Sequence, residues 1–257
     1  MQEITTVISN VEITPGYSRM LLSCPGIAAE ARPGQFLMLK YWRGNQLFFR
    51  RPFSINSVHR SDGTLEILYK VVGAGTELMQ SLPVGAEVDA LGPLGHGFPL
   101  RPEMKRIAVV GRGVGAAPMR YLAEEARRMD IEVHAYISGA KEEYLFDRDL
   151  YSACGCEFNG MIGNGMNVTA FLFNDVQKMH FDAVYVWGSK RLMKDVYDMM
   201  EMDDFEAYCS LEAHMACGIG ACKGCIVSAW DEDGTERYVR VCKEGPVFPL
   251  KRMVKHD

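Results

Sequence analysis

Four cysteines near the C-terminus constrain this 257-residue chain more than any other feature of its sequence. They are Cys217, Cys222, Cys225 and Cys242. Four, two and sixteen residues separate them, a spacing typical of proteins that hold a [2Fe–2S] cluster. The loop between the first three contains Gly218, Gly220 and Gly224, which tolerate unusual dihedrals and let N–H groups approach sulfur. We therefore expect these cysteines to ligate such a cluster.

Two other uses of these cysteines compete with the cluster, namely a zinc site and free thiols. Structural zinc sites usually combine two separated Cys-x2-Cys pairs, which this sequence lacks. A disulfide framework would instead spread its cysteines along a short secreted chain. The remaining cysteines, Cys24, Cys154, Cys156 and Cys209, are scattered. The one-residue spacing of Cys154 and Cys156 suits neither zinc nor a Cys-x-x-Cys pair, so we expect them to be unligated.

The composition narrows the class of protein. Hydrophobic residues make up 48% and charged residues 24% of the chain, as in ordinary globular proteins. A net charge of −5 gives no reason to expect nucleic acid or an anionic membrane as a partner. No apolar run approaches the roughly 20 residues of a membrane-spanning helix, and the acidic N-terminus is unlike a signal peptide. We predict a cytoplasmic protein of two domains and a small appendage.

Residues 1–100 have the pattern of a six-stranded antiparallel β-barrel. Short apolar runs alternate with turn residues, and one short helix near Thr76–Gln80 interrupts them. The predicted strands lie in EITTVISNVEI, SRMLLSC, GQFLMLKYW, PFSINSV, LEILYKVV and AEVDALGPL. A Gly/Pro-rich segment, residues 95–102, ends this first domain.

Residues 101–208 change period and predict a doubly wound parallel sheet. We expect strands at residues 106–110, 131–137 and 182–187, and helices at residues 118–129 and 191–200. Alternating strands and helices of this kind form α/β domains. Residues 209–257 then form a small C-terminal domain that carries the four cysteines.

Two segments of the barrel together predict a cradle for a pyrophosphate. Arg51-Pro-Phe-Ser54 begins a strand, and Leu68-Tyr-Lys-Val-Val-Gly-Ala-Gly-Thr76 ends another strand in glycines at a helix start. Backbone N–H groups at a helix N-terminus bind phosphate, and an arginine adds a charge-assisted contact. Taken alone, the first segment also fits an ordinary basic turn.

A third segment predicts a loop for a second dinucleotide. Gly111-Arg-Gly-Val-Gly-Ala-Ala-Pro118 follows a predicted strand and precedes a predicted helix, which is the context that such a loop requires. The alternative is a glycine-rich turn of any βα unit.

Together these segments resemble the ferredoxin–NADP reductase superfamily and, within it, the electron-transfer subunits of class 1B dihydroorotate dehydrogenase. The resemblance extends over almost the whole chain. It includes the motifs already quoted and also Pro33–Phe36, Leu91–Phe98, Ser210–Cys217 and Arg240–Phe248. The cysteine spacing and Arg51–Ser54 are its most specific parts.

The resemblance implies three cofactors or substrates: FAD on the barrel, the [2Fe–2S] cluster, and NAD(H) on the α/β domain. The implied cofactor-binding residues are Arg51, Pro52, Phe53, Ser54, Leu68, Tyr69, Lys70, Gly75, Thr76, Gly111, Gly113 and Gly115. It also implies an oxidoreductase that exchanges electrons between NAD and an FMN-containing catalytic subunit, which oxidises dihydroorotate to orotate. The implied assembly has two copies of each subunit.

Two positions depart from the family's pattern and keep other functions open. The nicotinamide loop usually reads Gly-Gly-Gly-x-Gly, whereas this chain has Arg112 at the second position. Trp187-Gly-Ser-Lys190 stands where the superfamily typically has Cys-Gly-Pro. One alternative is an NAD(P)H–ferredoxin or electron-bifurcating oxidoreductase subunit. The other is a partner-binding subunit with impaired NADH turnover.

Overall fold

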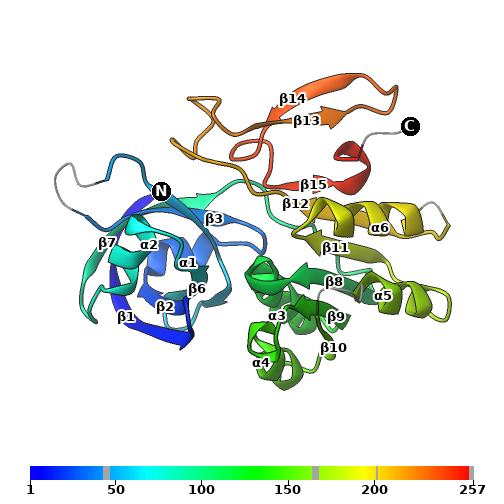
Figure 1. Ribbon diagram of the computed structural model, residues 1–257, viewed down its shortest axis with the longest axis horizontal. Helices are drawn as coiled ribbons and strands as arrows, with labels where there is room; N and C mark the ends of the chain where they lie inside the picture. Colours follow the sequence, from blue (N-terminus) through cyan, green and yellow to red (C-terminus); the bar gives the residue numbers. More distant parts are fainter. Residues whose placement is uncertain (43–46, 164–167, 201, 255–257) are drawn as a thin grey trace.

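The N-terminal part of the chain curves into an antiparallel barrel (Figure 1), described here from a computed structural model. The structure describes residues 1–42, 47–163, 168–200 and 202–254. The sheet has the order β4-β3-β7-β1-β2-β6-β5. Its strands are β1 (Gln2–Thr14), β2 (Tyr17–Ser23), β3 (Phe36–Lys40), β4 (Arg51–Ser54), β5 (Ser57–His59), β6 (Thr64–Lys70) and β7 (Glu87–Leu94). Two short helices, α1 (Pro25–Glu30) and α2 (Ala74–Gln80), connect strands of the barrel.

One bent strand closes the barrel. The sequence predicts a single strand over PFSINSV, but the structure divides it into β4 and β5, at opposite edges of the sheet. The backbone turns at Ile55 and Asn56, whose N–H groups donate to the carbonyls of Gln35 (3.1 Å) and Glu66 (2.8 Å). The two edge strands, β4 and β5, are therefore consecutive in the chain and joined by the turn at Ile55–Asn56. The predicted barrel is confirmed.

The second part of the chain is a mostly parallel sheet with the order β10-β9-β8-β11-β12-β15. The strands are β8 (Arg106–Arg112), β9 (Glu132–Gly139), β10 (Glu157–Ile162), β11 (Ala183–Trp187), β12 (Glu206–Ser210) and β15 (Val247–Pro249). Only β15 runs antiparallel to its neighbour among the strands described in this sheet. The predicted α/β architecture is confirmed.

Helices cover both faces of this sheet, as alternating side chains of its buried strands require. The helices are α3 (Ala117–Arg128), α4 (Arg148–Ala153), α5 (Val168–Val176) and α6 (Lys190–Met200). Ile107 and Val109 of β8 share one apolar core with α3 and α4. Ala108 and Val110 share the other core with α5 and α6. Short 3-10 turns occur at Gly113–Ala116, Glu142–Tyr144 and Leu250–Arg252. Within the described ranges, no helix is both long and apolar enough to cross a bilayer.

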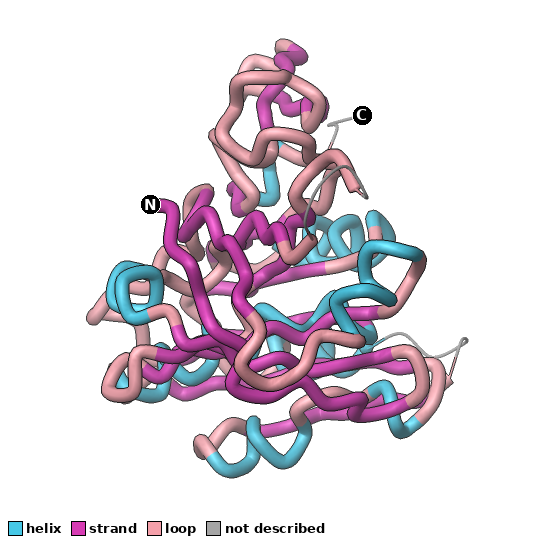
Figure 2. The backbone as a smooth tube through the Cα atoms, turned by 90° about the vertical axis from the view of Figure 1, so that its left-hand side faces the viewer, coloured by secondary structure: helices cyan, strands magenta, loops and turns pink. Residues whose placement is uncertain are grey.

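The cysteine-rich segment stands out from the rest of the molecule (Figure 2) and holds the hairpin of β13 (Ile226–Trp230) and β14 (Glu236–Arg240). After the hairpin the chain returns to the α/β domain, where β15 pairs with β12. The His96 N–H also donates to the Gly245 carbonyl (2.6 Å), which ties this segment to the barrel. The boundaries at residues 100 and 208 stay predictions, although β15 links the last segment to the middle one.

A buried ionic network fixes the barrel against the α/β domain. Arg120 of α3 is 5% exposed and contacts Glu66 of β6 at 2.8 Å and Glu124 at 2.7 Å. Asn56 donates to the Ala117 carbonyl (2.6 Å), and Arg19 of the barrel pairs with Asp147. These contacts set how the predicted flavin and nicotinamide loops face each other.

Candidate functional site

A cavity of about 450 Å³ lies where the barrel, the α/β domain and the cysteine-rich segment meet. From the barrel it is lined by Phe36, Arg51, Pro52, Phe53, Ser54, Leu68, Tyr69, Lys70, Val72 and Thr76. The α/β domain contributes Val114, Ala117, Pro118 and Trp187, and the cysteine-rich segment with its approach contributes Leu211, Glu212, Ala213, Met215 and Pro246. All three parts of the chain therefore face one space of the size of a small-molecule site.

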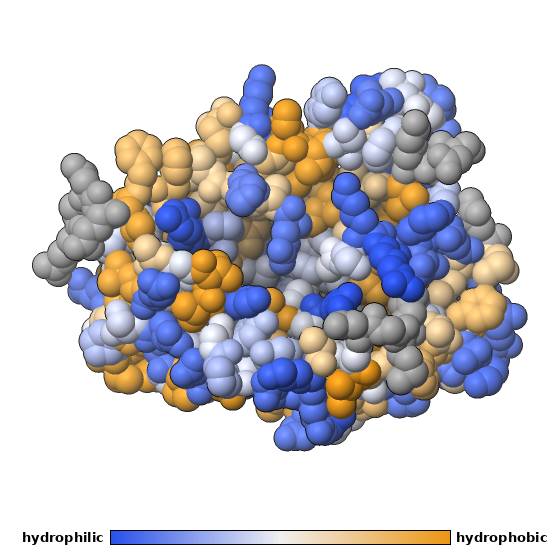
Figure 3. All heavy atoms as spheres, in the orientation of Figure 1, coloured by the Kyte–Doolittle hydropathy of each residue, from blue (hydrophilic) through white to orange (hydrophobic). Residues whose placement is uncertain are grey.

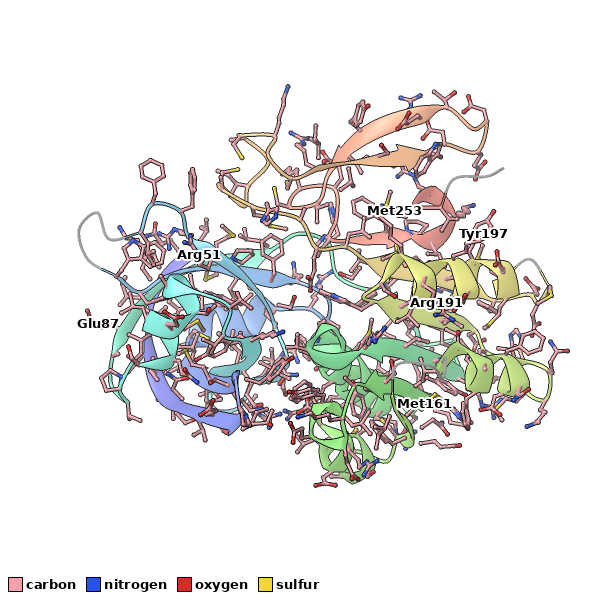
Figure 4. All side chains as sticks on the ribbon, in the orientation of Figure 1. Arg51, Glu87, Met161, Arg191, Tyr197 and Met253 are labelled. Carbon is pink, nitrogen blue, oxygen red and sulfur yellow. The ribbon has the colours of Figure 1, made fainter. Side chains whose placement is uncertain are left out.

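Arg51 is held in place at the barrel side of this cavity (Figure 4). Its guanidinium donates to the Phe49 carbonyl and lies 5.7 Å from the centre of the Trp42 ring. An arginine oriented in this way presents its remaining N–H groups in a fixed fork, the geometry that suits a phosphate.

The close approach of Arg51 to the start of α2 explains why residue 75 is a glycine. A Cβ atom on Gly75 would lie 3.1 Å from Arg51 Nε, which is tighter than an ordinary contact. The Tyr41 hydroxyl donates to the Gly75 carbonyl (2.7 Å), and Thr76 Oγ1 accepts from the Val72 N–H (2.8 Å). Gly75 thus lets the arginine approach the first turn of α2, where the cradle for a pyrophosphate stays a prediction.

The side chains of the predicted flavin-binding residues Leu68, Tyr69 and Lys70 point in different directions. Tyr69 points its hydroxyl at Asn10 Oδ1 (2.9 Å), and burial raises its pKa. Leu68 is buried against Ala117 and Phe146, at the seam between the two domains. Lys70 is exposed, with Nζ 5.5 Å from the centre of the Tyr17 ring. The cavity wall here is therefore apolar, with cationic groups at its rim.

The glycines of the predicted nicotinamide loop shape a turn instead of lining the cavity. Gly113 has φ +54°, and a Cβ on Gly111 would lie 2.7 Å from the Ala116 Cβ. Both positions therefore require glycine. The neighbouring Val114, Ala117 and Pro118 line the cavity in their place. The loop lies at the carboxyl end of β8, between β9 and β11, where open α/β sheets bind ligands.

Trp187 occupies the carboxyl end of β11, in register with Gly111. Its side chain is 2% exposed and its Nε1–H donates to Glu212 Oε1 (3.2 Å). Gly115 passes close to it, since a Cβ there would lie 3.5 Å from Trp187 Cδ1. The indole is therefore fixed in the cavity wall between the nicotinamide loop and the segment that leads to Cys217. Arg112 is exposed.

The four predicted ligands fall into two pairs. Cys225 and Cys242 have their sulfur atoms 3.2 Å apart and are buried against Phe36 and Met38 of β3. Cys217 accepts a hydrogen bond from the backbone N–H of Cys222 (3.5 Å). In the described part of the chain, no three His, Cys, Asp or Glu side chains converge as a site for a single metal ion. Two pairs of thiols fit a two-iron cluster, in which each iron takes two protein ligands, better than one tetrahedral zinc.

Backbone N–H groups point at these sulfur atoms, as a loop around an anionic cluster requires. Gly220 donates to Cys242 Sγ (3.1 Å) and Gly224 to Cys222 Sγ (3.4 Å). Burial opposes ionisation of Cys217, but the N–H groups of Cys222 and Ile219 lower its pKa. Gly218 and Gly220 have φ of +71° and +84°, and a Cβ on Gly218 would lie 2.5 Å from Met38 Cγ. The glycines therefore serve both the loop and its close packing on the barrel.

Several residues of the cavity wall were not among the expected binding residues. Glu212 and Met215 lie in the approach to the cysteines, and Val72, Val114 and Pro246 lie within segments that were quoted for other reasons. The residue types alone indicate no binding role, so only the fold shows that these side chains share one wall. Glu212 has one local signal, its position five residues before the first cysteine ligand.

Comparison with known proteins finds family models for two parts of the chain. Residues 212–254 match the family model of the iron–sulfur cluster binding domain of dihydroorotate dehydrogenase B. Residues 5–98 match the oxidoreductase FAD-binding domain. The electron transfer subunit of dihydroorotate dehydrogenase B (NAD⁺) from Enterococcus faecalis is 31% identical and covers 98% of both chains. The subunit of the same name from Desulforamulus reducens is 32% identical over 96% of both chains.

Solved structures share the fold at lower identity. The NADH-dependent reduced ferredoxin–NADP oxidoreductase structure matches with a TM-score of 0.82 and 21% identity, over 98% of this chain and 90% of that one. A ferredoxin NADP⁺ reductase from Neisseria gonorrhoeae with bound FAD and NADP matches with a TM-score of 0.63 and 19% identity, over 79% and 92%. These likenesses confirm the predicted combination of barrel and α/β domain.

Proposed function

We propose a route for electrons through this chain, which belongs to the family of electron transfer subunits of dihydroorotate dehydrogenase B. The resemblance stated from the sequence is thereby confirmed, and the chain is an oxidoreductase subunit with FAD-binding and iron–sulfur domains. Electrons pass between the catalytic subunit, which oxidises dihydroorotate in pyrimidine synthesis, and NAD. Within this chain they pass through the [2Fe–2S] cluster and FAD.

The observation that carries the proposal is the shared cavity. Its wall combines Arg51 and Thr76 of the barrel, Val114 and Pro118 of the nicotinamide loop, and Met215, two residues before Cys217. A flavin bound there supplies the exchange between two-electron hydride transfer and one-electron transfer. The chain itself supplies the positions of the three partners.

The residues of the cavity divide the work of binding. Arg51 and the first turn of α2 hold the pyrophosphate, and Lys70 adds positive charge at the rim. The apolar side chains of Leu68, Ala117 and Pro118 in the cavity wall exclude water from the space between the two domains. The 3-10 turn Gly113–Ala116 is the place for the pyrophosphate of NAD(H), since the Ala117 N–H already donates to the Val114 carbonyl and Pro118 has no N–H.

The cysteine loop supports a catalytic partner at this end of the molecule. Cys222 is exposed, and Ile219 and Ile226 beside it are 54% and 50% exposed. Figure 3 shows apolar residues in orange over the loops next to β13 and β14. A cluster near the surface with apolar neighbours suits docking of an electron partner. From the family resemblance, we propose that this partner is an FMN-containing subunit and that two copies of each subunit assemble.

The cytoplasmic location stays a prediction.

The test is dihydroorotate-driven reduction of NAD⁺ by this chain co-purified with the catalytic subunit of its own source. The complex should reduce NAD⁺, and Cys222→Ser should abolish this reduction while the catalytic subunit still oxidises dihydroorotate with a dye as acceptor. A complex that reduces NAD⁺ equally well with Cys222→Ser would contradict the route. Light scattering of the complex tests the proposed assembly of two copies of each subunit.

A second function follows from Trp187, which lies in the wall where hydride transfer is expected. The indole and its bond to Glu212 favour a chain that binds NADH yet reduces its flavin slowly, as in the partner-binding alternative. Rapid reduction of the bound flavin by NADH would eliminate this alternative.

A further inference from the structure

Cys154 and Cys156 form a close pair of thiols away from the shared cavity. Cys154 ends α4, Gly155 turns the chain with φ +81°, and Cys156 precedes β10. The two sulfur atoms lie 3.2 Å apart. From the sequence we expect both cysteines to be unligated, because a spacing of one residue fits no common motif. The structure brings them together nonetheless.

The other two cysteines outside the cluster provide a comparison within the same molecule. Cys24 and Cys209 are both fully buried, and burial raises the pKa of each thiol to about 12. These are inert thiols that fill apolar space. Cys154, in contrast, is partly exposed, while its neighbour Cys156 is 8% exposed. One accessible thiol beside one shielded thiol is the arrangement of an attacking and a resolving cysteine.

The surroundings separate the two thiols further. The Cys156 side chain lowers the pKa of Cys154 by hydrogen bonding to its thiolate, against the effects of burial and of Glu124. The same interaction and burial raise the pKa of Cys156. Arg127 of α3 lies beside the turn, with Nη2 3.4 Å from a Cβ placed on Gly155 and Nε bonded to the Cys154 carbonyl (3.3 Å). The charge of Arg127 acts on Cys156 and lowers its pKa, against the larger effects of Cys154 and of burial, which favours loss of the proton from this second thiol.

We propose that Cys154 and Cys156 form a reversible thiol–disulfide site that exchanges with low-molecular-weight disulfides. The Cys154 thiolate attacks one sulfur of the small disulfide, forms a mixed disulfide and releases one small thiolate. The Cys156 thiol then loses its proton, attacks Cys154 sulfur and releases the second small thiol. The protein loses two electrons and two protons, and the small disulfide gains them as two thiols.

The local backbone permits the second step. A disulfide bond is about 2.05 Å long, so the two sulfur atoms must approach by roughly 1.2 Å. Both side chains lie at a helix end next to a glycine with positive φ, where rotation about χ1 and a small backbone shift are available. The Cys154 thiol also donates to the Tyr151 carbonyl (3.2 Å), and this hydrogen bond is lost on oxidation.

Anaerobic holoprotein treated with oxidised glutathione provides the test, followed by acid quench, alkylation and peptide mass mapping. The peptide with both residues should carry an internal disulfide, formed at least tenfold faster than any change at Cys24 or Cys209. Cys156→Ser should instead accumulate a stable glutathione adduct on Cys154, and Cys154→Ser should stay unmodified at this peptide. Dithiothreitol should restore both thiols of the parent.

The matched serine variants keep the result interpretable, since each differs from the parent by one atom. Unchanged circular dichroism and flavin content establish that they fold. If the parent keeps both thiols free under these conditions, or accumulates the same glutathione adduct as Cys156→Ser, the proposal is wrong. The cluster cysteines lie on separate peptides, so their oxidation is scored independently.

Discussion

Replacing Arg51 by alanine tests the flavin cradle most sharply. The guanidinium is held by the Phe49 carbonyl and by the Trp42 ring, and it faces the first turn of α2 through Gly75. A hydrogen bond to a charged group contributes about 1.5–3 kcal/mol. At about 1.4 kcal/mol for each tenfold change, FAD affinity should fall by about 10- to 150-fold.

Arg50→Ala is the matched control, because it removes the same charge one residue away. Arg50 points at Asp89, with Nη2 2.6 Å from Oδ2, and does not line the cavity. The assay is calorimetric titration of each apoprotein with FAD. Arg51→Ala should weaken FAD binding, whereas Arg50→Ala should leave it unchanged. Equal FAD affinity in the two variants would refute the assignment of Arg51.

Four further predictions concern other parts of the molecule. Cys222→Ser should abolish the visible absorption of the cluster but retain stoichiometric FAD. Metal analysis of the parent protein should find iron and no stoichiometric zinc. Trp187→Cys should speed stopped-flow reduction of the flavin by NADH with little change in NADH affinity, whereas Trp187→Phe, which keeps a ring, should not. Arg120→Ala should lower the free energy of unfolding by about 3–5 kcal/mol, because it leaves Glu66 buried without its closest cation; a loss below 1 kcal/mol would refute this. Burial raises the pKa of Glu66, but Arg120, His59 and Arg19 together hold it below its ordinary value of 4.5. The contribution of Glu66 to the free energy of unfolding should therefore be present above pH 4.5 and disappear as acid protonates the carboxylate. Glu66→Gln should remove this pH dependence from the stability measured by urea unfolding.

The sequence predicted the site best where the chemistry fixes both residue type and spacing. The cysteine ligands and Arg51–Ser54 belong to this kind: Cys225 and Cys242 pack together against β3, and Arg51–Ser54 line the cavity, while their roles as ligands stay predictions. The barrel and the α/β sheet were also predictable, because a hydrophobic period of two residues indicates a strand and a period of about 3.6 residues indicates a helix.

Other features depend on contacts between distant segments, which a local pattern does not contain. The predicted strand PFSINSV divides at Ile55–Asn56 because its two halves, β4 and β5, pair with different strands, β3 and β6, and lie at opposite ends of the strand order. The nicotinamide glycines shape a turn, and their neighbours line the cavity. The closeness of Cys154 and Cys156 depends on the left-handed conformation of Gly155 after α4, which the sequence permits without requiring it.

One cavity is proposed to connect NAD(H), flavin and cluster within this chain. Anaerobic titration of the isolated holoprotein with NADH measures this connection directly, with flavin absorbance and low-temperature electron paramagnetic resonance recorded on the same samples. We expect that the flavin bleaches and that the signal of a reduced [2Fe–2S] cluster rises with it. Bleaching of the flavin without any cluster signal, in protein with its full complement of iron, would show that the flavin and the cluster are not connected.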